Sequence, residues 1–296
     1  MKKIFARGEA PLVRMTAQSP AVPAGGPTRS AVWILVLVLA LAAVQGAPAQ
    51  TETAAPSLNA MSLNGASGLF AIPSGRIGWE GKSDLGLDLG MSYNFIKKDP
   101  IAKVGMSFFK WVEFTVASDF QPYVETNDNR LNNTDALMGF KVQFPTKRTA
   151  VALGGNVQFI NHDSYRTAGQ LYAAATYPGS IFGMAAETTL ALGYTFHDNP
   201  NSNIDFGMGF DLDLLPNIFQ HIIHWVTDYS NFSYSDEPLG TEPYYRGSLN
   251  TGIRVNFATI PALSKLKFSV DLIATDIFDH GDRSFIMGFV FGVPIK

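Results

Sequence analysis

Two segments of this chain alternate strictly between bulky apolar and small polar residues, and no other feature constrains the fold as tightly. In the segment 84–95 the apolar positions are Leu85, Leu87, Leu89, Met91, Tyr93 and Phe95. In the segment 204–214 they are Ile204, Phe206, Met208, Phe210, Leu212 and Leu214. Successive side chains of a β-strand point to opposite faces, so each segment predicts a strand with one apolar face and one small, polar face. Each segment is about eleven residues long, which suits a tilted strand that crosses a bilayer.

Weaker alternation predicts further strands at 101–109, 112–120, 135–145, 149–160, 169–178, 183–197, 246–257, 265–275 and 283–293. These make eleven strands in all, whereas single-chain bacterial barrels have an even number. A strand at 218–229 would supply the twelfth. The apolar residues of that segment also fit one face of a helix, so a short helix in the lumen or on the membrane is the alternative.

The connections between these strands fall into two classes. Short links are expected near 109–111, 145–148, 179–182, 215–217 and 258–264, and generally longer ones at 96–100, 121–134, 161–168, 198–203, 230–245 and 276–282. Short periplasmic turns and longer extracellular loops are typical of outer-membrane barrels. The predicted fold is therefore an all-β, closed antiparallel transmembrane barrel of about twelve strands, within a range of roughly eight to fourteen.

A soluble exported β-protein would show similar alternation, so the choice depends on which face is crowded. Here the polar face carries mostly Gly, Ser, Asn and scattered Asp, which is thin for a water-exposed surface. Only 16% of the residues are charged, against about a quarter in typical soluble proteins. These features favour a barrel whose apolar face contacts lipid and whose polar face encloses water.

The N-terminus has the features of a secretion signal. Basic residues precede an apolar run from Ala31 to Val44, and Ala47-Pro48-Ala49 offers a cleavage site that would place the mature terminus near Gln50. An uncleaved anchor, or a true start at Met15, are the alternatives. The predicted divisions are a signal peptide at 1–49, a leader or periplasmic segment at 50–80, and a barrel at 81–296.

Aromatic residues near the strand ends indicate two belts at the membrane–water interfaces. One rim would carry Trp111, Phe144, Tyr177, Phe257 and Phe291. The other would carry Tyr93, Phe95, Tyr194 and Phe196.

Two short motifs resemble known barrels. Gly68-Leu69-Phe70-Ala71-Ile72-Pro73-Ser74 resembles the start of several outer-membrane barrel families, among them porin-like and YjbH-type exopolysaccharide-associated barrels. Phe109-Lys110-Trp111-Val112-Glu113 resembles the inner turns of such barrels. The chain departs from the usual pattern at its end, Val293-Pro294-Ile295-Lys296, where these families carry an aromatic residue for the insertion machinery.

Charged residues on the polar face would line the lumen. The acidic ones are Asp84, Asp88, Glu113, Asp119, Glu187, Asp205, Asp211, Asp213 and Asp271. The basic ones are Lys103, Lys141, Arg246, Arg254 and Lys267. They would either line a water-filled pore with a mild cation preference, since charged rings set selectivity, or pair across the lumen and plug it. A barrel of about twelve strands lies between the filled eight-stranded barrels and the open porins, so both arrangements fit.

No pattern identifies a metal site, a cofactor or a catalytic group. Asp211 and Asp213 would lie about 6.6 Å apart along a strand, too far to share an ion easily, and His221-x-x-His224 has no carboxylate fixed beside it in sequence. Cysteine is absent, which excludes disulfides and thiolate ligands. Ser164 lies near His162, but no spacing defines a nucleophile and its base.

The leading hypothesis is a monomeric, passive, porin-like channel for small solutes in the bacterial outer membrane, with a mildly acidic lumen and no enzymatic activity. Its expected partners are the lipid bilayer and the barrel-insertion machinery. The net charge of −3 gives no reason to expect a nucleic acid. The alternatives are a non-conducting surface anchor or adhesin that acts through its outer loops, and a soluble exported β-protein.

Overall fold

The computed structural model describes residues 60–79, 83–120, 125–126, 129–130, 134–144, 146, 149–162, 164–196, 204–231, 247–278 and 283–295. The predicted signal peptide, its cleavage site and Arg246 lie outside these residues.

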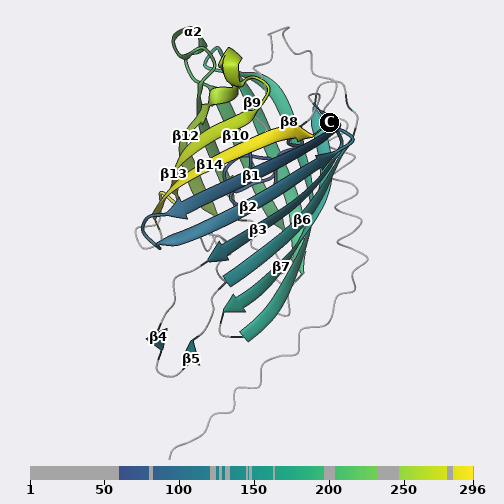
Figure 1. The fold of residues 1–296 in the computed structure, drawn as a ribbon, viewed down its shortest axis with the longest axis vertical. Coiled ribbons are helices and arrows are strands. Elements are labelled where there is room, and N and C mark those ends of the chain that lie inside the picture. Colours follow the sequence, from purple (N-terminus) through teal and green to yellow (C-terminus); the bar gives the residue numbers. More distant parts are fainter. Residues whose placement is uncertain are drawn as a thin grey trace, which may run out of the picture.

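Twelve strands of the described chain close into one antiparallel barrel (Figure 1). They are β1 (Leu85–Asn94), β2 (Asp99–Phe108), β3 (Val112–Phe120), β6 (Thr134–Phe144), β7 (Ala150–His162), β8 (Ser164–Ile181), β9 (Met184–Phe196), β10 (Asp205–Asp213), β11 (Ile223–Ser230), β12 (Ser248–Asn256), β13 (Lys267–Thr275) and β14 (Ser284–Ile295). Each strand pairs with its neighbour in the chain order, and β1 closes the sheet on β14 from Leu85↔Ile295 to Asn94↔Ile286. Closure removes every sheet edge, so the backbone groups pair within the protein as a bilayer requires. The predicted fold class and strand number are confirmed.

The segment 218–229, for which a strand and a short helix are the two alternatives, contains parts of both. A single helical turn, α2 (Pro216–Phe219), lies within the β10–β11 connection, and β11 follows it as the twelfth strand. β11 pairs with β10 from Gly207↔Ser230 to Asp213↔His224. The short-turn end also holds η2 (Phe257–Thr259) and η3 (Pro261–Leu263) between β12 and β13. Among the described residues, no helix is long and apolar enough to cross a membrane.

The predicted loop at 161–168 is wrong. β7 and β8 continue to pair as far as His162↔Ser164, so this hairpin is longer than expected. The polar residues of the segment suggested a loop, but main-chain pairing does not depend on side-chain polarity, and a ladder can extend into water. The predicted loop at 121–134 holds a small sheet of its own, formed by β4 (Glu125–Thr126) and β5 (Asn129–Arg130).

Most bulky residues of the alternating segments are exposed or partly exposed on the outside of the barrel, as predicted, whereas Leu212 is fully buried. Leu89 is 48% exposed and Met208 is 54% exposed. Further exposed apolar side chains on this face include Phe114, Met138, Leu171, Phe285, Phe289 and Phe291. A broad apolar outer surface is the face that a transmembrane barrel presents to lipid.

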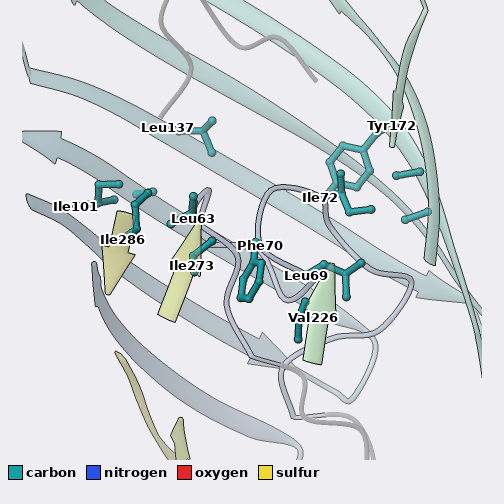
Figure 2. Packing of buried hydrophobic residues seen from close by; sticks show 13 residues of the cluster. Leu63, Leu69, Phe70, Ile72, Ile101, Leu137, Tyr172, Val226, Ile273 and Ile286 are labelled. Carbon is teal, nitrogen blue, oxygen red and sulfur yellow. The ribbon is translucent and has the colours of Figure 1, made fainter. Parts of the chain in front are cut away.

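The interior holds a segment of the chain, which we name the plug and define as residues 60–79. Nearly all of its residues are buried, and it contacts strands on every side of the barrel. Figure 2 shows Leu63, Leu69, Phe70 and Ile72 of the plug beside apolar residues of the inner wall. The sequence predicts a leader or periplasmic segment at 50–80, whereas the described part of that segment lies in the lumen.

The small residues of the inner face make room for the plug. A Cβ atom at Gly86 would lie 2.2 Å from the Trp79 indole, and one at Gly292 would lie 3.0 Å from it. A Cβ atom at Gly209 would lie 2.6 Å from Leu69 Cδ1. The Gly positions that suggested a water-lined wall therefore accommodate protein.

Candidate functional site in the barrel lumen

Most of the predicted lumen residues do face the interior. They are Asp88, Lys103, Glu113, Asp119, Lys141, Glu187, Asp205, Asp211, Asp213, Arg254, Lys267 and Asp271, and all of them are wholly or largely buried. Asp84 is the exception. Its side chain is 79% exposed at the start of β1, where it forms an ion pair with Lys110 at 3.3 Å.

Glu113 and Lys141 hold one residue of the plug from both sides. They are cross-strand neighbours on β3 and β6, with Nζ 3.3 Å from Oε1. The Glu113 carboxylate accepts hydrogen bonds from Ser67 N at 2.8 Å and Ser67 Oγ at 2.5 Å, and also from Gly78 N at 2.8 Å. Lys141 Nζ donates to Ser67 O at 2.8 Å. The pair therefore satisfies both main-chain groups of Ser67 in a buried site.

Arg254 binds the next two carbonyl groups. Its guanidinium forms a two-pronged ion pair with Asp271, with Nε to Oδ1 at 2.8 Å and Nη2 to Oδ2 at 3.1 Å. It also donates to Gly68 O at 3.0 Å and to Leu69 O at 3.4 Å. The guanidinium carbon lies 5.3 Å from the centre of the Phe70 ring, within the range of a cation–π contact.

Asp228 on β11 binds the following amides. Its Oδ2 accepts hydrogen bonds from Phe70 N and Ala71 N, each at 2.7 Å. Its Oδ1 accepts from Asn250 Nδ2 at 2.7 Å. Sequence reasoning missed this residue because 218–229 was ambiguous. The inward series His224, Val226, Asp228 and Ser230 is the signal that could have found it.

A third ion pair, formed by Lys267 and Asp88, binds the end of the plug nearest β1. Lys267 Nζ lies 2.6 Å from Asp88 Oδ2, and Trp79 Nε1 donates to Asp88 Oδ1 at 2.9 Å. The same ammonium lies 5.1 Å from the centre of the Trp79 ring. These contacts anchor the plug close to the point where the chain enters the barrel wall.

Further contacts reach the plug from other strands. Lys103 Nζ donates to Ser62 O at 3.2 Å, and Thr176 Oγ1 accepts from Gly75 N at 2.9 Å. Arg76 Nη2 of the plug lies 2.6 Å from Glu187 Oε1. Most of these wall groups bind the main chain of the plug.

Two histidine–aspartate pairs lie near the short-turn end. His224 Nδ1 lies 2.6 Å from Asp211 Oδ1, and His221 Nδ1 contacts Asp213 Oδ2. Within the part of the chain that the structure describes, no group of three or more His, Cys, Asp or Glu residues could hold a metal ion.

A group of acidic side chains lies toward the end of the barrel with the longer loops. Asp119 and Asp135 are cross-strand neighbours on β3 and β6. Asp205 Oδ2 accepts hydrogen bonds from Gln170 Nε2 at 2.8 Å and Thr195 Oγ1 at 2.5 Å. These side chains lie on the inner wall beyond the Glu113–Lys141 pair.

The predicted interface aromatics lie on the outside, toward the two ends of the strands. At the short-turn end, Trp111, Phe144 and Phe291 are exposed, and Tyr177 and Phe257 are partly exposed. At the other end, Phe95 and Phe196 are exposed and contact the partly exposed Tyr93 and Tyr194, with ring centres 5.2 and 4.9 Å apart. Their placement fits two interfacial belts.

Comparison with known proteins gives structural likenesses only. No protein-family model matches the sequence, and no curated protein matches it. The KdgM porin is similar in structure with a TM-score of 0.45 and 6% identity, over 71% of this chain and 99% of that chain. The outer membrane protein Omp33 of Acinetobacter baumannii gives 0.42 and 11%, over 72% and 98%. LpxR from Salmonella typhimurium gives 0.42 and 9%, over 71% and 100%. At these identities and scores the likenesses give no information on function.

Proposed function

We propose that this chain is a monomeric channel of the bacterial outer membrane whose lumen is closed at rest by residues 60–79. The observation that carries the proposal is the way in which the plug is held. The wall binds it through side chains such as Glu113, Asp228 and Arg254, and the plug adds no strand to the barrel. It can therefore leave without disturbing the sheet that spans the membrane.

Departure of the plug would leave a polar path through the barrel. Among the described residues, the inner wall carries more acidic side chains than basic ones, and Asp119, Asp135, Asp205 and Asp228 are among the acidic ones. Fixed charges of one sign along a narrow path favour ions of the opposite sign. The open channel is therefore expected to prefer cations and small cationic solutes.

Planar-bilayer recordings test this proposal. The full mature chain is expected to conduct rarely, and a variant that lacks residues 60–79 is expected to form stable channels with a cation-selective reversal potential in a salt gradient. Folding of both proteins is checked by heat-modifiable migration on a gel. A deletion variant that folds and inserts but never conducts would refute the channel.

A non-conducting surface anchor is the second candidate, and the depth of plug burial favours it. Phe70 and Ile72 of the plug are fully buried within the barrel, so both side chains would have to leave a packed site before the lumen could open. The same recordings separate the two candidates. Conduction by the deletion variant supports a closed channel, and its absence supports an anchor.

A further inference from the structure

We propose that the inner wall is a binding site for a folded-back, largely apolar polypeptide segment, and that residues 60–79 are a resident occupant that a second peptide of similar chemistry can replace. This inference goes beyond the channel, since peptide binding does not require conduction. It names the kind of ligand that would compete with the plug.

The wall groups follow a definite order along the plug. From Ser67 to Ala71 they meet one N–H, three carbonyl groups and then two N–H groups in succession, contributed by four side chains on β3, β6, β11 and β12. Carboxylates lie where the main chain of the plug donates N–H groups, and the Lys141 and Arg254 cations lie where its carbonyl oxygens accept. This order complements a polypeptide main chain.

The wall combines hydrogen bonds to the main chain of the plug with apolar contacts to its side chains. Leu69, Phe70 and Ile72 belong to one buried cluster with Tyr172, Val226 and Ile273 of the wall (Figure 2). Gly209 leaves space for Leu69, since a Cβ atom there would lie 2.6 Å from Leu69 Cδ1. The wall therefore selects bulky apolar side chains at defined positions of the bound segment.

The bound segment has a defined shape. Gly68 N donates to Ala60 O at 2.8 Å, and Leu63 N donates to Phe70 O at 2.8 Å, so the segment folds back on itself. A Cβ atom at Gly68 would lie 2.2 Å from Ile72 O. Glycine is therefore required at this position of a competing peptide, followed by two bulky apolar residues.

A cut version of the full chain tests the proposal. A protease site is inserted between Trp79 and Ser83, the protein is folded in detergent, and the chain is cut so that the plug is held by non-covalent contacts alone. A fluorescently labelled synthetic peptide of residues 60–79 is then added. We expect it to enter the barrel saturably and to be displaced by the same peptide without the label. A peptide of scrambled sequence and one carrying Gly68→Ala are expected to compete at least tenfold less well.

Substitutions in the barrel wall distinguish specific binding of the peptide from non-specific retention in the lumen. Asp228→Asn and Arg254→Gln are each expected to weaken peptide binding about tenfold or more, because each weakens or removes two hydrogen bonds between a charged group and the main chain. Asp84→Asn is the matched control, since Asp84 is exposed at the rim and contacts Lys110. Heat-modifiable migration shows which variants fold, and Arg254→Lys should retain part of the affinity.

Several outcomes would overturn the proposal. They are equal binding of the native and scrambled peptides, unchanged binding by the folded Asp228→Asn protein, and displacement by a single-chain fatty acid as effective as displacement by the peptide. Conductance measured on the same samples tests the channel separately. Peptide exchange without conduction would remove the channel and leave the peptide site standing.

Discussion

Lys267 on β13 lies 2.6 Å from Asp88 on β1, although 179 residues separate them in the chain. Strand β14 lies between their two strands, so the pair spans an inner face on which Gly292 carries no side chain. A Cβ atom at Gly292 would lie 2.1 Å from Asp88 Oδ1. The indole of Trp79 fills the space beside this pair and donates to the same carboxylate. One glycine thus allows an ion pair and a plug residue to share the interior.

Removal of Lys267 should therefore lower the free energy of unfolding far more than the loss of an exposed ion pair would. Lys267→Met leaves the buried Asp88 carboxylate with the Trp79 N–H as its remaining partner among the contacts above, and loss of one partner of a buried pair typically destabilises by about 3–5 kcal/mol. The free energy of unfolding in urea, followed by tryptophan fluorescence, measures the effect. The double variant Asp88→Asn with Lys267→Met should recover much of the loss. A single variant as stable as the native chain would contradict a dry, paired site.

Gly86 should be needed for the plug to pack in the lumen, whereas the barrel should fold without it. A Cβ atom there would lie 2.2 Å from the Trp79 indole, so Gly86→Ala should push Trp79 out of its site while β1 remains paired. In a background carrying Trp33→Phe, Trp111→Phe and Trp225→Phe, acrylamide should quench Trp79 at least twofold more strongly than before the change. Gly169→Ala is the control, because a Cβ atom at Gly169 meets nothing within 4 Å. Unchanged quenching would show that Trp79 does not rest against Gly86.

The contrast between the two faces explains what the sequence could predict. Leu89 and Met208 face one uniform solvent, the lipid, so their period of two is enough to place them and to locate strands of ten and nine residues. Gly86 and Gly292 face the interior, and glycine looks the same in a sequence whether it borders water or a tryptophan. Whether residues 60–79 lie inside or outside the barrel depends on contacts such as Glu113 with Ser67, across 46 residues, which no local pattern encodes.

The ambiguity at 218–229 has a similar cause. Ile218 and Phe219 belong to the short helix α2, while Val226 and Asp228 lie on the inner face of β11. Two structures with different periods adjoin here, so neither period describes the whole segment. The even number of strands expected of a closed barrel predicts the twelfth strand here better than either period does.

A charged residue on the outer face should destabilise the barrel more strongly the deeper it lies in the bilayer. Met208 lies near the middle of β10 and is 54% exposed on the apolar side, so Met208→Lys should destabilise the barrel in phospholipid vesicles by about 2–4 kcal/mol. Phe182 is 84% exposed in the turn between β8 and β9, and Phe182→Lys is expected to change stability by less than about 1 kcal/mol. Urea titration of the two variants in the same vesicles gives both values. Equal effects at the two positions would argue against a bilayer around β10.

Asp228 provides the most direct test of the link between the plug and conduction. Asp228→Asn removes the negative charge that accepts the amides of Phe70 and Ala71, and hydrogen bonds to a charged group contribute about 1.5–3 kcal/mol each. Weakening the closed state by about 1.4 kcal/mol would raise the ratio of open to closed channels about tenfold. Single-channel recording in planar bilayers measures this ratio directly, with Asp84→Asn as a control that leaves the plug contacts intact. If the two variants show the same open fraction while Asp228→Asn remains folded, then either the plug does not gate the barrel or this carboxylate does not hold it there.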